Sequence, residues 1–190
     1  MTRFSDLILR AGALCIALAF CTPFTAHAQD EERDFFDGIE ARNVGPFRGG
    51  RATVAVGVRD NPHVYYMGTT GGVWMTENAG ASWKPVSDDH IGSSVGAIAV
   101  AESDPNVVVV GMGESPFRNI ASSQGDGVYK STDGGHNWTH LGFEDTRQIG
   151  EIHIHPTNPD VIWVAAQGNT YDEADDGGVY KTEDGGETWR

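Results

Sequence analysis

Short apolar or alternating runs recur along the chain from Ala52 onward, and each is followed by Gly, Pro, Asn or Asp. Runs of this length and composition predict β-strands, and the polar pairs between them predict turns. The turns are expected at Asn61-Pro62, Asp104-Pro105 and Asn158-Pro159. The expected strands are Ala52–Val58, Val64–Thr69, Gly72–Met75, Val95–Ala101, Val107–Met112, Gly127–Lys130, Gly150–Ile154, Val161–Ala166 and Gly178–Lys181.

Every third strand leads into the same short segment, which occurs three times. The copies are Thr76–Trp83, Ser131–Trp138 and Thr182–Trp189, and their tryptophans lie 55 and then 51 residues apart. A period of this size indicates a repeat fold. A fourth short strand is expected after the first two copies, and a four-stranded antiparallel meander is typical of a β-propeller blade. We therefore expect an all-β chain with almost no helix, in which about three blades form an incomplete ring.

The repeated segment fits the pattern Ser/Thr-x-Asp-x-Gly-x-x-Trp and resembles the Asp-box, or BNR repeat. In such a turn an Asp or Asn accepts hydrogen bonds from the following backbone amides, Gly supplies a positive φ, and Trp folds back as an apolar plug. Because each residue has this local role, and because Asn78 cannot act as a general base, we expect a structural motif. Its positions are Asn78, Gly80 and Trp83, then Asp133, Gly135 and Trp138, then Asp184, Gly186 and Trp189.

Residues 1–28 have the features of a secretory signal peptide: Arg3 and Arg10 give a positively charged n-region, Ala11–Phe20 is an apolar run, and Ala26-His27-Ala28 is a small-x-small cleavage site. The run is too short to span a bilayer, so no membrane insertion is expected after cleavage. Both cysteines lie in this segment, and Cys21 follows Phe20 rather than the small residue of lipoprotein signals. We expect an exported protein that is periplasmic, on the outer surface or secreted.

The rest of the chain divides into a polar lead-in over 29–41 and a partial propeller over 42–190. The repeats run over about 42–90, 91–145 and 146–190. Propellers typically close with about 4 to 8 blades, so the remaining blades are expected from a longer chain.

The net negative charge of the chain argues against two classes of partner. Without the signal segment the chain keeps 11 of its 13 basic residues and 26 of its 27 acidic residues. This negative excess repels nucleic acid and anionic lipid surfaces, and it argues against both as partners. It identifies no ligand.

Meander topology places the first turn and the Asp-box at one end of each blade, and the loop between the second and third strands at the other end. These second loops differ most, because Thr69-Thr70-Gly71 is short whereas Gly113–Gly125 and Gly168–Asp176 are long. Insertions on one face of a repeat array often mark its binding face. The candidate ligand-binding residues are Arg48, Arg51, Glu114, Arg118, Arg147, Tyr171 and Asp172. The alternative is that acidic loop residues only solvate the turns.

Two segments contain residue types that can bind a metal ion. Glu151, His153 and His155 alternate along one strand, but they offer only part of a ligand set, and a polar channel wall is the alternative. The run Asp172–Asp176 could attract calcium, but it lacks the spacing of a known calcium loop. We expect no metal and no cofactor.

The segment Asn43–Arg51, followed by Thr69–Trp74, looks most like exported bacterial proteins of the sortilin N-terminal, or glycosyl-hydrolase-like BNR, type. The wider superfamily includes sialidases, xyloglucanase-type glycoside hydrolases, a photosystem assembly factor, and the sortilin and Vps10 receptors. The resemblance therefore implies the fold and leaves the function open. Xyloglucanase-type enzymes carry a catalytic Asp where this chain has Thr70, and a hydroxyl cannot replace a carboxylate in that mechanism. Sialidases have Phe/Tyr-Arg-Ile-Pro, whereas Phe47-Arg48 precedes two glycines.

These observations favour an exported binding scaffold that recognises a peptide or protein through loops on one face, and they assign no catalytic residue. The alternative is a glycoside hydrolase or carbohydrate-binding propeller of the xyloglucanase or sialidase type, with a glycan ligand and catalytic carboxylates partly outside this chain.

Overall fold

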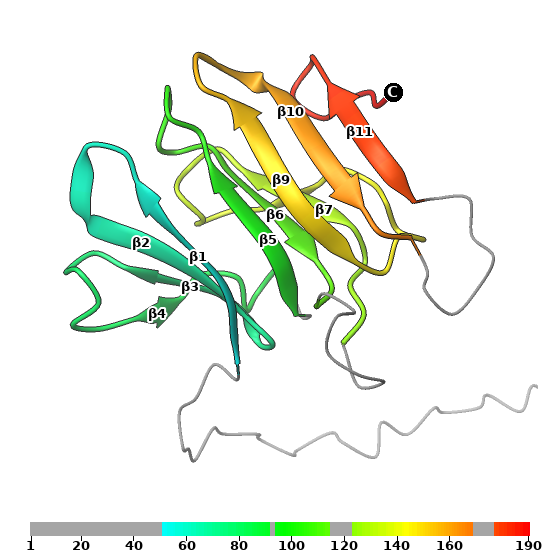
Figure 1. The fold of residues 1–190 in the computed structure, drawn as a ribbon. Coiled ribbons are helices and arrows are strands. Elements are labelled where there is room, and N and C mark those ends of the chain that lie inside the picture. The colour runs from blue at the N-terminus through cyan, green and yellow to red at the C-terminus, as the bar shows by residue number, and fades with distance from the viewer. Residues whose placement is uncertain (1–50, 92–93, 115–122, 169–176) are drawn as a thin grey trace, which may run out of the picture. The chain divides into compact units, whose positions relative to one another are not determined.

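The computed structural model describes residues 51–91, 94–114, 123–168 and 177–190. The chain divides into the units Met1–Asn43 and Val44–Arg190, and every described residue lies in the second unit. The described residues form strands and turns with no helix among them (Figure 1). The prediction of an all-β chain is confirmed.

The strands form three antiparallel sheets, each a meander in sequence order. Blade 1 contains β1 (Ala52–Val58), β2 (Asn61–Thr69), β3 (Gly72–Thr76) and β4 (Lys84–Pro85). Blade 2 contains β5 (Val95–Val100), β6 (Val108–Met112), β7 (Val128–Ser131) and β8 (Thr139–His140). Blade 3 contains β9 (Ile149–His155), β10 (Asn158–Ala166) and β11 (Gly178–Thr182). Because β5 contacts both β1 and β9, the first strands of the three blades lie side by side, as in a segment of a propeller (Figure 1).

Two of the three predicted turns lie earlier in the chain than expected. β2 begins at Asn61 and β10 at Asn158, so the chain reverses before these residues, with Asp60 at a φ of 62°. The Asn side chain instead caps the backbone after the turn. Asn61 Oδ1 accepts a hydrogen bond from the His63 N–H at 3.2 Å, and Asn158 Oδ1 accepts one from the N–H two residues later at 3.1 Å. The proline that follows each Asn is tolerated because it lies at the start of a strand.

Apolar side chains fill the spaces between neighbouring blades. Successive residues of a strand point to opposite faces of its sheet. In β6, Val108 and Val110 therefore pack into the cluster between blades 1 and 2, whereas Val109 packs into the cluster between blades 2 and 3. Blade 2 is apolar on both faces because a neighbouring blade covers each of them.

Each Asp-box turn is held by its own side chains. In the second box, Ser131 Oγ donates to Asp133 Oδ1 at 2.8 Å and accepts from the Gly135 N–H at 2.8 Å. Asp133 Oδ1 also accepts from the Asn137 N–H at 2.9 Å. The other boxes make equivalent contacts through Thr76 and Asn78 and through Thr182 and Asp184. These bonds provide acceptors for the backbone N–H groups of the tight turn, which cannot pair with a neighbouring strand.

Two consecutive residues of each box have a positive φ. The pairs are Ala79 (56°) and Gly80 (88°), Gly134 (73°) and Gly135 (94°), and Gly185 (77°) and Gly186 (105°). Ala79 is the exception, because a side chain with Cβ is strained in the left-handed region.

The boxes are also joined to the preceding blade. The Gly134 carbonyl accepts from the Tyr66 hydroxyl at 2.9 Å, and the Gly185 carbonyl accepts from Lys130 Nζ at 3.1 Å. Burial, helped by the nearby charge of Glu77, raises the pKa of Tyr66 to about 12, so the hydroxyl stays protonated and can donate. A donor of the preceding blade thus reaches the same carbonyl in the second and third boxes.

The box tryptophans make the reciprocal bond. Trp138 Nε1 donates to the Val86 carbonyl at 2.9 Å, and Trp189 Nε1 donates to the Leu141 carbonyl at 3.1 Å. Trp138 and Trp189 also pack against the two interblade clusters. The sequence predicted the tryptophan as an apolar plug of its turn, and the structure shows that Trp138 and Trp189 also pack between the blades.

Exchanging the residues at one box position tests the backbone strain. Ala79→Gly is expected to stabilise the fold by up to about 1 kcal/mol, because glycine adopts a positive φ without strain. Gly134→Ala, at the equivalent position, is expected to destabilise it by about 1–2 kcal/mol. An added Cβ there would meet only the Tyr66 hydroxyl at 3.6 Å, so strain alone accounts for the loss. Urea unfolding curves measure the change in the free energy of unfolding of each variant. Changes of the same sign would contradict the prediction.

Acid should weaken two of the three boxes. Hydrogen bonds from the Asn137 side chain, and from the Thr182 hydroxyl, hold the pKa values of Asp133 and Asp184 respectively well below their usual range. A lowered pKa stabilises the fold above the unfolded-state pKa of about 4, and this contribution is lost as the pH falls toward the folded-state value. The stability gap between wild type and Asp133→Asn/Asp184→Asn should therefore narrow between about pH 5 and pH 3. Urea unfolding at both pH values checks this, and an unchanged gap contradicts it.

Candidate functional site

Hydrogen bonds tie each Asp-box to the first turn of its own blade or to the start of the second strand, and so define one end of the blades. Each of the three bonds is 2.9 Å long, from the N–H groups of Ala79, Gly134 and Gly185 to the carbonyls of His63, Asn106 and Asp160. The loops between the second and third strands therefore leave from the opposite end, which we call the loop end.

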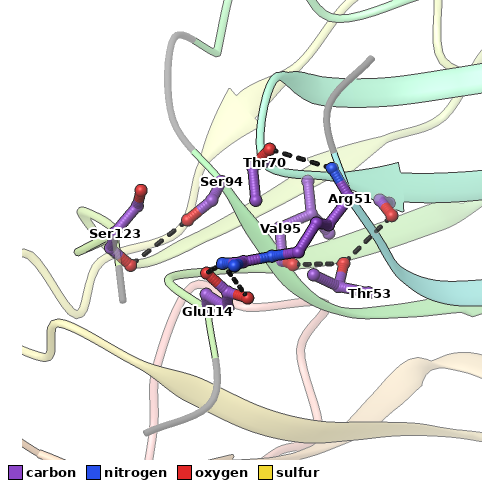
Figure 2. A network of polar contacts seen from close by, with 8 residues as sticks. Arg51, Thr53, Thr70, Ser94, Val95, Glu114 and Ser123 are labelled. Carbon is purple, nitrogen blue, oxygen red and sulfur yellow. Dashed lines mark hydrogen bonds and ion pairs between the residues drawn. The ribbon is translucent and has the colours of Figure 1, made fainter. Parts of the chain in front are cut away.

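At the loop end a buried carboxylate of blade 2 binds an arginine that leads into blade 1 (Figure 2). Glu114 follows β6 and its side chain is 6 % exposed, whereas Arg51 precedes β1 and its side chain is 56 % exposed. Arg51 Nη2 donates to both carboxylate oxygens, at 2.6 and 2.5 Å. Among the described residues, Glu114 is the partner of the Arg51 guanidinium.

Backbone contacts anchor both partners of this ion pair. The Arg51 N–H donates to Thr70 Oγ1 at 3.3 Å, and the Thr70 N–H donates to the Arg51 carbonyl at 3.1 Å. The Glu114 N–H donates to the Ser123 carbonyl at 2.9 Å, and Ser94 Oγ donates to the same carbonyl at 3.2 Å (Figure 2). Loops of two blades therefore hold the pair in place.

Arg147 belongs to the same end. Gly113, the residue before Glu114, packs so closely on Arg147 that an added Cβ would lie 1.9 Å from the Arg147 carbonyl oxygen. Arg147 Nη1 donates to Gln124 Oε1, so a neighbouring loop also orients this guanidinium. The structure thus brings together three of the candidate residues, Arg51, Glu114 and Arg147.

Two buried carboxamide oxygens at this end, Gln148 Oε1 and Gln167 Oε1, have no donor among the described residues. Gln148 is 1 % exposed, and its carbonyl accepts from the Gln167 N–H at 2.9 Å. Buried acceptors normally have a partner, so these oxygens suit a bound water. Gln124 and Gln167 were not among the predicted residues, because in sequence they look like solvated loop amides.

A separate concavity of about 410 Å³ lies beside β4. Its lining residues are Lys84, Pro85, Val86, Asp88, Asp89, His90, Gly135 and His136. Lys84 Nζ is paired with Glu77 at 2.8 Å. None of the candidate ligand-binding residues lines this concavity.

Four candidate residues, Arg48, Arg118, Tyr171 and Asp172, lie outside the described residues. Within the described ranges, no three His, Cys, Asp or Glu side chains form a group that could hold a metal ion. His153 Nε2 and Glu151 Oε1 are 4.0 Å apart, and both side chains are largely exposed. In the described part of the chain there is also no helix long and apolar enough to cross a membrane.

Three adjoining meander blades, each with an Asp-box after its third strand, define this chain as a segment of an Asp-box β-propeller. The sequence matches the Sortilin-Vps10 family (sortilin, neurotensin receptor 3) over residues 71–190, and the chain belongs to that family.

Similar proteins agree with this fold. The photosystem II assembly lipoprotein Ycf48 of Synechococcus sp. (strain CC9902) is 28% identical over 134 residues, which is 70% of this chain and 34% of that protein. The crystal structure of an ancestral GH74 enzyme matches with a TM-score of 0.56 at 20% identity, over 73% of this chain and 18% of that one. The GH74 xyloglucanase from Xanthomonas campestris matches with a TM-score of 0.52 at 18% identity, over 75% of this chain and 20% of that one. The chain thus spans about a third of the curated relative, and the two structures show the fold alone.

Removing one partner of the buried pair should leave Glu114 without its counter-charge. We expect Arg51→Ala to lower the free energy of unfolding by about 1–3 kcal/mol, because a buried carboxylate then lacks its donor. Adding Glu114→Gln should recover part of that loss, since the amide is uncharged. Urea unfolding of the two single variants and the double variant measures the coupling.

The control for this cycle is the exposed pair Arg59–Glu102, whose side chains are 58% and 47% exposed. Arg59→Ala should cost only about 0–1 kcal/mol, as surface pairs do. Equal losses at Arg51 and Arg59 would show that the burial of Glu114 has no energetic consequence.

Proposed function

We propose that the loop end of this chain is a polypeptide-binding surface, in which Arg51 binds a carboxylate of the ligand. The observation that carries the proposal is the pairing of Arg51 with Glu114, which orients a guanidinium while leaving its side chain 56% exposed. Arginine donates charge-assisted hydrogen bonds to carboxylates, and a group that is oriented beforehand loses less entropy on binding.

Arg147, oriented by Gln124, supplies a second cation. Two oriented cations fit a ligand that presents more than one carboxylate, as an acidic peptide does. The cyanobacterial relative is named for the assembly of photosystem II, which supports a protein ligand here.

The glycoside hydrolase alternative needs two carboxylates across one cleft. At the position where the xyloglucanase-type resemblance implies an Asp, Thr70 has a hydroxyl that accepts from the Arg51 backbone N–H at 3.3 Å. The only carboxylate in the described Arg51 network is Glu114, and it is already bound to Arg51. This arrangement favours binding over hydrolysis as the proposed activity.

We place this binding outside the cytoplasm, in the periplasm or beyond. The support is the secretory pattern of residues 1–28 and the description of the Synechococcus relative as a lipoprotein.

The test uses a pool of short fluorescein-labelled peptides rich in Asp and Glu, and a matched pool with Asn and Gln instead. Fluorescence anisotropy should show binding of the acidic pool at physiological salt, where a screening length of about 8 Å limits repulsion by the acidic protein. Arg51→Lys keeps a cation beside Glu114 but removes the guanidinium N–H groups that do not contact Glu114, so it should weaken binding about tenfold or more.

Arg59→Lys is the matched control, because Arg59 lies near the first turn of blade 1 and is paired with Glu102. It should leave the affinity unchanged. Equal effects of the two substitutions, or equal binding of both pools, would count against a role for Arg51. Binding of xyloglucan oligosaccharides without binding of peptides would support the glycan alternative instead.

A further inference from the structure

The concavity beside β4 lies where blade 1 meets the Asp-box of blade 2. Most of its lining residues belong to β4 and the connection that follows it, whereas Gly135 and His136 belong to the second Asp-box. β4 is the last strand of blade 1, so the concavity lies on the side of the blade away from β1. An added Cβ at Gly135 would lie 3.4 Å from Val86 Cγ2, so the floor of the concavity is a contact between the two blades.

The connection after blade 2 has an aromatic ring where the connection after blade 1 has a carboxylate. The two connections align because the carbonyls of Val86 and Leu141 both accept from the tryptophan of the next box. Two positions further on are Asp88 and Phe143. The Phe143 ring lies edge-on to the Trp189 ring with 5.0 Å between centroids, and its backbone has a φ of 70° whereas that of Asp88 is negative. The next Asp-box is thus covered by a ring after blade 2, and by no such ring after blade 1.

Asp88 and Asp89 occupy a tight turn that is anchored at its first residue. The His90 N–H donates to the Ser87 carbonyl at 2.9 Å, and Ser87 Oγ accepts from the Val73 N–H of β3 at 2.8 Å. Ser87 is 0% exposed, whereas Asp88 and Asp89 are exposed. Among the described residues, neither carboxylate has a hydrogen-bond or ion-pair partner. A fixed turn therefore presents both carboxylates at the edge of the concavity.

The charges around the concavity favour a cationic ligand. Lys84 lines it, but its charge is already paired with Glu77 at 2.8 Å. On the opposite wall the His136 N–H is bound by the carboxylate of Asp133 at 3.0 Å, which adds a further negative charge to that side. Local carboxylates attract a cation and repel an anion, and the overall negative charge of the chain has the same effect.

We propose that this concavity binds an arginine side chain of a partner polypeptide, at a site separate from the loop end. The aliphatic stem of the arginine lies on the apolar floor around Val86, and its guanidinium donates to the carboxylates of Asp88 and Asp89. The imidazoles of His90 and His136 line the same concavity and offer ring faces. A planar guanidinium stacks on such faces and binds carboxylates in two-point fashion, so arginine is favoured over lysine.

The test uses three pools of short fluorescein-labelled peptides, which carry arginine, lysine or the uncharged citrulline at the same positions among neutral residues. Fluorescence anisotropy with the full chain at physiological salt should show the tightest binding for the arginine pool. Asp88→Asn/Asp89→Asn should weaken that binding about tenfold or more, because the guanidinium loses its charged acceptors. Urea unfolding should show that this variant is as stable as the wild type, since neither carboxylate has a partner among the described residues.

The matched control is Glu144→Gln/Asp145→Asn, which removes an exposed acidic pair from the connection after blade 2, next to Phe143. It should leave the affinity for the arginine pool unchanged, and so should Arg51→Lys, because these residues do not line the concavity. Equal losses in the two double variants, or equal binding of the arginine and lysine pools, would overturn the proposal. General attraction to an acidic chain would then account for the binding.

A second measurement locates the site without any substitution. In NMR spectra of the wild-type chain, titration with N-acetylarginine amide should shift the imidazole ring resonances of His90 and His136, which line the concavity. The ring resonances of His63 and His153 should stay in place, because both residues are exposed and lie outside it. Shifts of all four rings, or of neither His90 nor His136, would equally overturn the proposal.

Discussion

Each of the second and third Asp-boxes is bonded to the preceding blade in both directions, and the remaining structure depends on this exchange. A carbonyl of the box accepts from Tyr66 or Lys130, and the box tryptophan donates to the backbone after the preceding blade's fourth strand. These groups would be costly to bury without partners. The bonds therefore set the distance between blades, and apolar side chains fill the space that remains.

The loop end follows from this spacing. Because β1 and β5 lie side by side, the residue before β1 meets the second residue after β6, and Arg51 reaches Glu114 across two blades. The carboxylate is buried and the guanidinium is half exposed, so the pair presents positive charge outward from a chain with a large excess of acidic residues. A buried acid thereby acts on the surface indirectly, by fixing the orientation of an arginine.

Much of the fold could be predicted because it is local. The Asp-box uses side chains within a few residues of one another, and the alternation of apolar residues assigns β1 with the bounds that the structure gives. The start of β2 was misplaced, because Asn61 caps the residues that follow it rather than forming the turn itself. An Asx-Pro pair looks the same in sequence in either case.

The sequence by itself determined the repeat, the three box turns and the end of the blades from which the variable loops leave. Only the tertiary structure decided the partners of particular side chains. Glu114 was a candidate for direct ligand contact, yet its charge is bound by Arg51, which lies 63 positions away in the chain. Likewise Trp138 bonds to Val86 across 52 positions. Such contacts depend on how closely two blades approach, and that distance is set by the packing of many side chains at once rather than by a local pattern.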